Sequence, residues 1–196
     1  MSNEIVFDIE TQNTFAEVGN DFKKFKISVV SIYSYATDSY QSFVENELPK
    51  LWVIFEKADR IIGYNSEHFD LPILNNYYPG DLSRISHLDL MKIIKENVGV
   101  RLKLSDVAEA TLDNITKSAD GLQAIRWWKE GKIGEIKKYC EQDVKVTKEL
   151  YEFGKNNKQL FYKSLTGETL PFAVNFDAPI ARTNSATANL NLTLPF

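Results

Sequence analysis

The first apolar segment of the chain carries two acids on one face of a predicted strand. Residues 5–11 alternate as a β-strand does, and Asp8 and Glu10, two positions apart, therefore share a face. The opposite face is apolar: Ile5, Phe7 and Ile9. Neighbouring carboxylates repel each other, and burying an unpaired one is costly. A divalent cation held between them would remove both penalties.

Further apolar patterns predict the rest of the architecture. Strand-like segments follow at residues 27–36, 40–44, 60–65 and 86–90. Helical spacing predicts helices at residues 46–57, from about 71 to 79, from 90 to 98, at 103–111, at 120–131 and at 133–153. An initial hairpin followed by alternating helices and strands predicts an α/β domain with a central mixed sheet of about five strands flanked by α-helices. The first strand is expected near the centre of this sheet.

The C-terminal segment differs in composition from the rest of the chain. Residues 1–165 contain no linker or repeat and are expected to form one domain. Beyond residue 165 charge nearly disappears, and Asn, Thr and Ala dominate residues 183–193. Residues 166–196 are therefore interpreted as a C-terminal appendage that is extended or partly disordered.

Composition narrows the class of protein and the kind of metal. The 196 residues contain no apolar run long enough for a membrane span, and strand-like sequence by residue 4 leaves no room for a signal peptide. Cys140 is the only cysteine, which excludes an internal disulfide and indicates a cytoplasmic protein. With His68 and His87 it cannot build a thiolate zinc cluster, so oxygen ligands and Mg²⁺ or Mn²⁺ are expected. The net charge of −4 disfavours binding to nucleic acid, unless cations neutralise acids that cluster at a metal site.

Two more acids stand where a site could form. Asp70 follows the predicted strand at residues 60–65, at the sheet edge where α/β proteins build sites, but it is equally well placed to cap the next helix. Asp143 lies within or beside the inward stripe of the last helix, one turn after Tyr139. A hydrogen-bonded pair of Tyr139 and Asp143 would explain the placement of these two residues without a metal.

Taken together, the acids favour a metal site. Asp8, Glu10, Asp70 and Asp143 come from three elements that this topology could bring to one sheet edge. Clustered carboxylates raise one another's pKa unless cations neutralise them. Two divalent cations are the usual arrangement for phosphoryl transfer.

Three motifs resemble the DEDD exonuclease superfamily, whose fold is RNase H-like. Asp8-Ile9-Glu10-Thr11 resembles the first motif, and Asn65-Ser66-Glu67-His68-Phe69-Asp70 the second, in the form found in the proofreading domains of family B DNA polymerases. Tyr139-Cys140-Glu141-Gln142-Asp143 resembles the third motif of the tyrosine branch, since the histidine branch would have His at Lys138. The resemblance covers roughly residues 4–155, and no polymerase domain follows, as in small stand-alone relatives of that exonuclease domain.

The resemblance implies a 3′→5′ exonuclease acting on single-stranded ends, with DNA favoured over RNA. It implies that Asp8, Glu10 and Asp143 bind one cation, and that Asp8 bridges to a second, which Asp70 supports. Tyr139 would orient the attacking water, because its ordinary pKa near 10 suits a positioner better than a base.

Three further residues are candidates for substrate binding. The resemblance implies that Thr11 lies beside the terminal nucleotide, and that Asn65 and Phe69 shape the site or stack on a base. Phe69 fits a core position as well.

Two other interpretations remain open. The chain could be a non-catalytic nucleic-acid-binding or partner-docking module, which the acidic balance and the tail favour; a protein partner is then expected, though the sequence does not identify it. It could also be a structural α/β domain in which the acids are helix caps and surface pairs.

Overall fold

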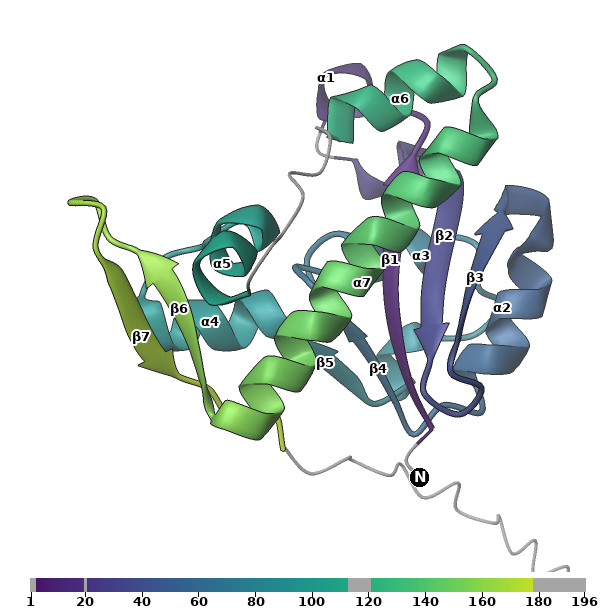
Figure 1. Cartoon of the computed structure of the whole chain (residues 1–196). Coiled ribbons are helices and arrows are strands. Elements are labelled where there is room, and N and C mark those ends of the chain that lie inside the picture. Colours follow the sequence, from purple (N-terminus) through teal and green to yellow (C-terminus); the bar gives the residue numbers. More distant parts are fainter. Residues whose placement is uncertain (1–2, 20, 113–120, 178–196) are drawn as a thin grey trace, which may run out of the picture.

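A five-stranded mixed sheet with helices on both faces forms the body of the protein (Figure 1). The computed structural model describes residues 3–19, 21–112 and 121–177. The strands lie in the order β3-β2-β1-β4-β5, so the acid-bearing first strand is central, as predicted. Their bounds are β1 Glu4–Thr11, β2 Ile27–Ser34, β3 Ser39–Val44, β4 Arg60–Gly63 and β5 His87–Asp89. β1 pairs antiparallel with β2 and parallel with β4.

The helices occupy the segments that helical spacing predicts, except for α1, which is not predicted, and α3, which is shorter than predicted. Their bounds are α1 Phe15–Val18, α2 Leu48–Phe55, α3 Asp70–Leu74, α4 Leu90–Val98, α5 Leu104–Thr111, α6 Gly121–Lys129 and α7 Ile133–Asn157, with 3₁₀ turns at Phe22–Lys24, Glu45–Glu47 and Leu82–Arg84. The predicted helix at residues 71–79 is wrong in length, because α3 ends at Leu74. Two asparagines follow there, and Tyr77 instead turns its hydroxyl to the Ile27 amide of β2. Asp120, the first residue of the predicted helix 120–131, lies outside the described residues.

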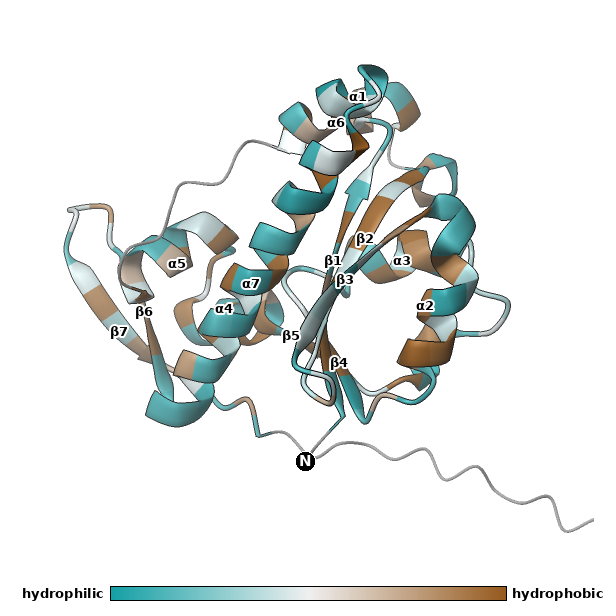
Figure 2. Cartoon of the chain, turned by 45° about the vertical axis from the view of Figure 1, so that its right-hand side comes forward, coloured by the Kyte–Doolittle hydropathy of each residue, from teal (hydrophilic) through white to brown (hydrophobic). Residues whose placement is uncertain are grey.

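Side-chain alternation along β1 separates two cores. Ile5, Phe7 and Ile9 pack with α2 and α3 on one face of the sheet. Val6 points to the other face, where it joins the cluster built from α4, α5 and α7. Hydrophobic residues therefore line both faces of the sheet, and Figure 2 shows hydrophobic stretches in brown along its strands. The second face also carries Asp8 and Glu10. No helix in the described part of the chain combines the length and the apolarity that crossing a bilayer would require.

A second, two-stranded sheet follows α7 and packs beside α5 (Figure 1). Its strands are β6 Gln159–Lys163 and β7 Thr169–Ala173, so the predicted boundary at residue 165 falls in the turn that joins them. Phe176, beyond β7, is fully buried, and its ring lies so close to Gly154 that a Cβ there would approach within 2.3 Å. Its carbonyl accepts a hydrogen bond from Arg60 of β4 at 3.0 Å. Residues 166–177 thus pack against the rest of the described chain, while residues 178–196 lie outside the described residues.

Phe176 is expected to contribute to global stability despite its distance from the sheet in sequence. Phe176→Ala should lower the free energy of unfolding by about 3–5 kcal/mol, because it deletes a fully buried ring. Leu165→Ala, at a fully exposed position of the turn, is the matched control and should change stability by less than about 0.5 kcal/mol. Urea unfolding monitored by circular dichroism measures both. Equal midpoints for the two variants would contradict the packing described above.

Candidate metal centre

β4 ends before it reaches the acids of β1. β4 pairs with β1 only along Glu4–Val6 and then leaves the sheet, so β1 continues past it from Phe7 to Thr11. The loop that follows β4 crosses this edge and delivers Asp70 at the start of α3. The carboxylate of Asp70 accepts a hydrogen bond from the backbone amide of Ile9, which has no strand partner on that side. The site therefore sits at the carboxyl edge of the sheet, where the sequence places it.

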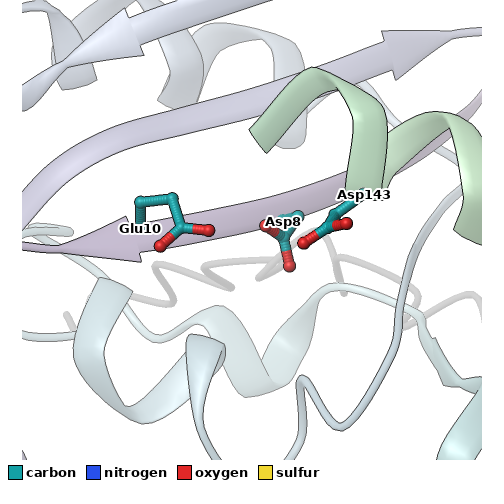
Figure 3. A group of neighbouring side chains, drawn as sticks. All are labelled: Asp8, Glu10 and Asp143. Atoms are coloured by element: carbon teal, nitrogen blue, oxygen red, sulfur yellow. The ribbon is translucent and has the colours of Figure 1, made fainter. Parts of the chain in front are cut away.

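Three carboxylates from two elements converge beside this part of β1. Asp8 and Glu10 project from β1, and Asp143 projects toward them from α7 (Figure 3). Each offers a ligand oxygen, and these oxygens lie within 4.8 Å of one another. An ion bound at 2.0–2.6 Å from each ligand joins oxygens up to about 5 Å apart, so the three can hold one metal ion together. Among the described residues, neither Asp8 nor Glu10 forms an ion pair with Lys or Arg.

Asp70 completes the acidic environment without belonging to that three-oxygen cluster. It is 4 % exposed, and its charge raises the pKa of both Asp8 and Glu10. Asp70 does not cap the helix in the manner weighed from the sequence, because α3 begins at Asp70 itself and Phe69 takes the capping position. The backbone amides of Asp70 itself and of Ile9 lower the pKa of its carboxyl, against the burial that raises it.

Burial and mutual repulsion act on these groups in the same direction. Burial raises the pKa of Asp8 and Glu10 well above their ordinary values, and the surrounding carboxylates raise them further. Burial also raises the pKa of Asp70 to about 7. Protons or cations must therefore compensate the charge of this site near neutral pH, and oxygen ligands of this kind suit a hard divalent cation.

Tyr139 lies one helical turn before Asp143 and reaches the same site. Its hydroxyl hydrogen-bonds the Asp143 carboxylate, and burial together with the charges of Asp143, Glu10 and Asp8 raises its pKa. Its ring meets that of Trp127 edge to face, with centroids 6.2 Å apart. Tyr139 therefore stays protonated at neutral pH and can donate or position, but it cannot act as a base.

The predicted substrate residues fall into two neighbouring hollows. Thr11 and Phe69 line a largely apolar cavity of about 410 Å³ beside Glu10. Phe69 also packs edge to face against Phe25, so it is both a core residue and a wall of the cavity. Asn65 lines a different pocket of about 310 Å³, next to α4.

Asp89 is a positioning residue that the sequence motifs do not include. It lies at the end of β5 and caps α4, accepting from the Met91 amide at 2.9 Å. The same carboxylate accepts from the amides of Asn65 and Glu67 at 2.8 and 2.9 Å, and so clamps the loop that carries Asp70. An aspartate between a predicted strand and a predicted helix is the sequence signal of such a cap.

Cys140 is a second residue whose role appears only in the structure. It is fully buried behind Asp8, with its Sγ 3.5 Å from Asp8 Oδ2 and 3.3 Å from the Asp8 carbonyl oxygen. The thiol is a weak donor to this carboxylate and lowers its pKa against the larger effects that raise it. Cys140 thus packs directly against the Asp8 ligand.

Comparison with known proteins agrees with this fold. The chain matches the model of the RNase_H superfamily over residues 5–153, so it belongs to the RNase H superfamily and has a nuclease-type fold. Both the predicted fold class and the resemblance to this group are confirmed. No curated protein matches the sequence.

A family B DNA polymerase from the hyperthermophilic archaeon Pyrobaculum calidifontis is among the similar solved structures. The match has a TM-score of 0.62 and 20 % sequence identity, and it covers 79 % of this chain. It covers only 24 % of the polymerase chain, so this protein spans about a quarter of that length. At this identity the likeness concerns the fold, and it agrees with the predicted resemblance to family B polymerases.

The raised pKa of Asp70 predicts how the metal-free protein responds to pH. Between pH 4 and 7 the folded chain keeps a proton on Asp70 that the unfolded chain releases, so Asp70 by itself makes stability fall as pH rises, by up to about 1.4 kcal/mol per pH unit. The raised pKa values of Asp8 and Glu10 act in the same direction. Asp70→Asn removes the Asp70 contribution. In EDTA, the variant should gain stability over wild type as pH rises from 4 to 7.

Thermal unfolding in EDTA across this pH range measures the difference between the two proteins. Mn²⁺ should reverse the order at pH 7.5, because it stabilises the wild type by binding its carboxylates. A difference that stays constant with pH in EDTA would contradict the assignment of the proton to Asp70.

The position of Cys140 predicts an effect on metal affinity without a loss of fold. Cys140→Val fills the same apolar space but removes the thiol donor to Asp8, and we expect the Mn²⁺ affinity to fall about tenfold, the low end for partners of metal ligands. Cys140→Ser restores a donor and should recover most of the affinity. Calorimetric titration with Mn²⁺ measures both variants, and an unchanged affinity in a folded Cys140→Val protein would rule out the role.

Proposed function

We propose that this protein is a metal-dependent 3′→5′ exonuclease that hydrolyses phosphodiester bonds at the end of a single-stranded nucleic acid. The observation that carries the proposal is the convergence of Asp8, Glu10 and Asp143, with oxygens within 4.8 Å of one another, in an RNase H superfamily fold. The order of the three sequence motifs supports the 3′→5′ polarity. The DNA polymerase among the similar structures supports nucleic acid as the substrate class and favours DNA over RNA.

The chain supplies ligands for two divalent cations, Mg²⁺ or Mn²⁺. In the proposal Asp8, Glu10 and Asp143 hold the first, and Asp8 with Asp70 supports the second. Cations bound there would supply an acidified water as nucleophile and would offset the charge that develops on the leaving oxygen. Asp8 would be the ligand common to both cations.

The remaining roles fall to residues around the carboxylates. Tyr139, protonated and hydrogen-bonded to Asp143, orients the attacking water. The 410 Å³ cavity beside Glu10 has the apolar walls that suit a nucleobase, with Phe69 on one side and Thr11 near the carboxylates. Thr11 donates its hydroxyl to the Asn13 carbonyl at 2.9 Å, which holds this part of the wall in place.

The proposal predicts a ranking of two variants. Asp8→Ala should lower the rate by about three orders of magnitude or more, because it removes the shared ligand. Tyr139→Phe should lower it by only about 10–100-fold, because the carboxylates remain. The assay is release from single-stranded and duplex DNA and RNA in Mn²⁺ or Mg²⁺, with a label at the 5′ end in one arm and the 3′ end in the other.

The two labels distinguish cleavage polarity, since a 3′→5′ exonuclease shortens 5′-labelled strands progressively and releases 3′ label at once as mononucleotide. Asp177→Ala, which removes an exposed carboxylate far along the chain, is the matched control and should keep full activity. Folded wild-type protein that binds these strands but never cleaves them would instead favour the non-catalytic binding module. The same inactivity without binding would leave the structural interpretation.

A further inference from the structure

The pocket beside α4 is formed by the same loop that delivers Asp70 to the carboxylates. It has a volume of about 310 Å³, and its lining includes Asn65, Glu67, His68, Asp89, Lys92, Lys95 and Arg101. The cationic side chains come from two places: Lys92 and Lys95 from α4, and Arg101 from the segment just after it. They converge on one hollow although the chain as a whole carries a net charge of −4.

The acids of this pocket are already engaged, so its free charge is positive. Glu67 forms an ion pair with Lys92 at 2.8 Å. Asp89 is only 6 % exposed, and its carboxylate oxygens accept hydrogen bonds from backbone amides of the loop and of α4. Lys95 and Arg101 are exposed, and within the described ranges neither takes part in an ion pair. Two cations are therefore available to an anionic ligand at this place.

Asn65 lines the pocket and belongs to the loop that leads to Asp70 in the metal centre. Its backbone is left-handed, with φ 62°, and its amide is bound by Asp89. Its side-chain oxygen accepts a hydrogen bond from the guanidinium of Arg101. Five residues further along the same loop, Asp70 enters the carboxylate site, and the charge of Asp89 reaches it, since that charge raises the pKa of Asp70. The pocket and the carboxylates are thus within electrostatic range of each other.

We propose that this pocket binds the phosphodiester backbone of a single-stranded nucleic acid, upstream of the 3′ end that lies at the carboxylates. Lys95 and Arg101 contact phosphate oxygens, and Lys92 and His68 border the path. The proposal rests on the proposed function for the direction of the strand. Affinity for such a backbone comes from Lys and Arg, and an acidic protein needs them concentrated where the strand passes.

Binding is measured without cleavage, so that the pocket is tested apart from catalysis. Fluorescence anisotropy follows 5′-fluorescein dT12 and rU12 in EDTA, at several salt concentrations, with wild type and the double variant Lys95→Ala/Arg101→Ala. The double variant should bind at least tenfold more weakly. The slope of log K against log salt should become shallower by about 1.4, which is about 0.7 for each lost phosphate contact. Both probes should lose affinity equally, because a backbone site does not read the sugar.

The matched control is Lys50→Ala/Lys57→Ala, which removes the same charge from α2 and the turn after it, on the opposite face of the sheet. It should leave the salt slope unchanged. Thymidine monophosphate as competitor separates a strand from a free nucleotide: it should displace dT12 no better from wild type than from the double variant. Equal losses for both double variants, or a wild-type protein that fails to bind either probe at low salt, would overturn the proposal.

A minimal substrate separates this proposal from the proposed function. The p-nitrophenyl ester of thymidine 5′-monophosphate occupies only the carboxylate site, so wild type and Lys95→Ala/Arg101→Ala should hydrolyse it equally in Mn²⁺, while the variant shows a raised KM for dT12. If neither protein hydrolyses the ester, the exonuclease proposal fails, and the EDTA binding arm still decides the pocket. If the variant loses ester hydrolysis while remaining folded, the pocket belongs to the carboxylate centre and the proposal fails.

Discussion

The constraint on which this structure depends is the repulsion among carboxylates held at the edge of its central sheet. Asp8 and Glu10 share a face of β1, Asp143 reaches them from α7, and Asp70 enters from the start of α3. Each of these elements packs firmly elsewhere, so the acids cannot move apart to relieve the repulsion. The fold thereby holds together a group of carboxylates that could bind a metal ion, and the apolar packing on both faces of the sheet supplies the free energy that keeps them in place.

Much of this could be predicted from the sequence, for reasons that differ from element to element. The alternation along residues 5–11 follows from strand geometry alone, and a central position follows from its apolar neighbours on both faces. The placement of Tyr139 and Asp143 on one side of α7 follows from helical spacing. These predictions concern local periodicity, which backbone geometry fixes without knowledge of the tertiary structure.

The features that could not be predicted depend on contacts between distant segments. From the sequence, Cys140 is predicted only to be a buried thiol, because nothing in the sequence shows that its Sγ lies against Asp8, 132 residues earlier. The short α3 could not be predicted either, since the Tyr77 hydroxyl that stabilises the alternative turn bonds to β2. The packing of the β6–β7 hairpin could not be predicted from composition. It depends on the burial of Phe176, just after β7, against Gly154, which is a property of the assembled domain.

A second group of buried charges on the same strand sharpens the case for a functional site. At the start of β1 the carboxylate of Glu4, 5 % exposed, is paired with the buried Arg60 and accepts a hydrogen bond from Tyr151 at 2.9 Å. Lys155 adds a further cation at 3.5 Å. The chain thus neutralises a buried acid with its own side chains where the role is structural. Four residues later, in the described part of the protein, Asp8 faces other carboxylates and no such cation. This difference within one strand argues that a bound cation, rather than a side chain of the protein, supplies the positive charge that neutralises Asp8 and Glu10.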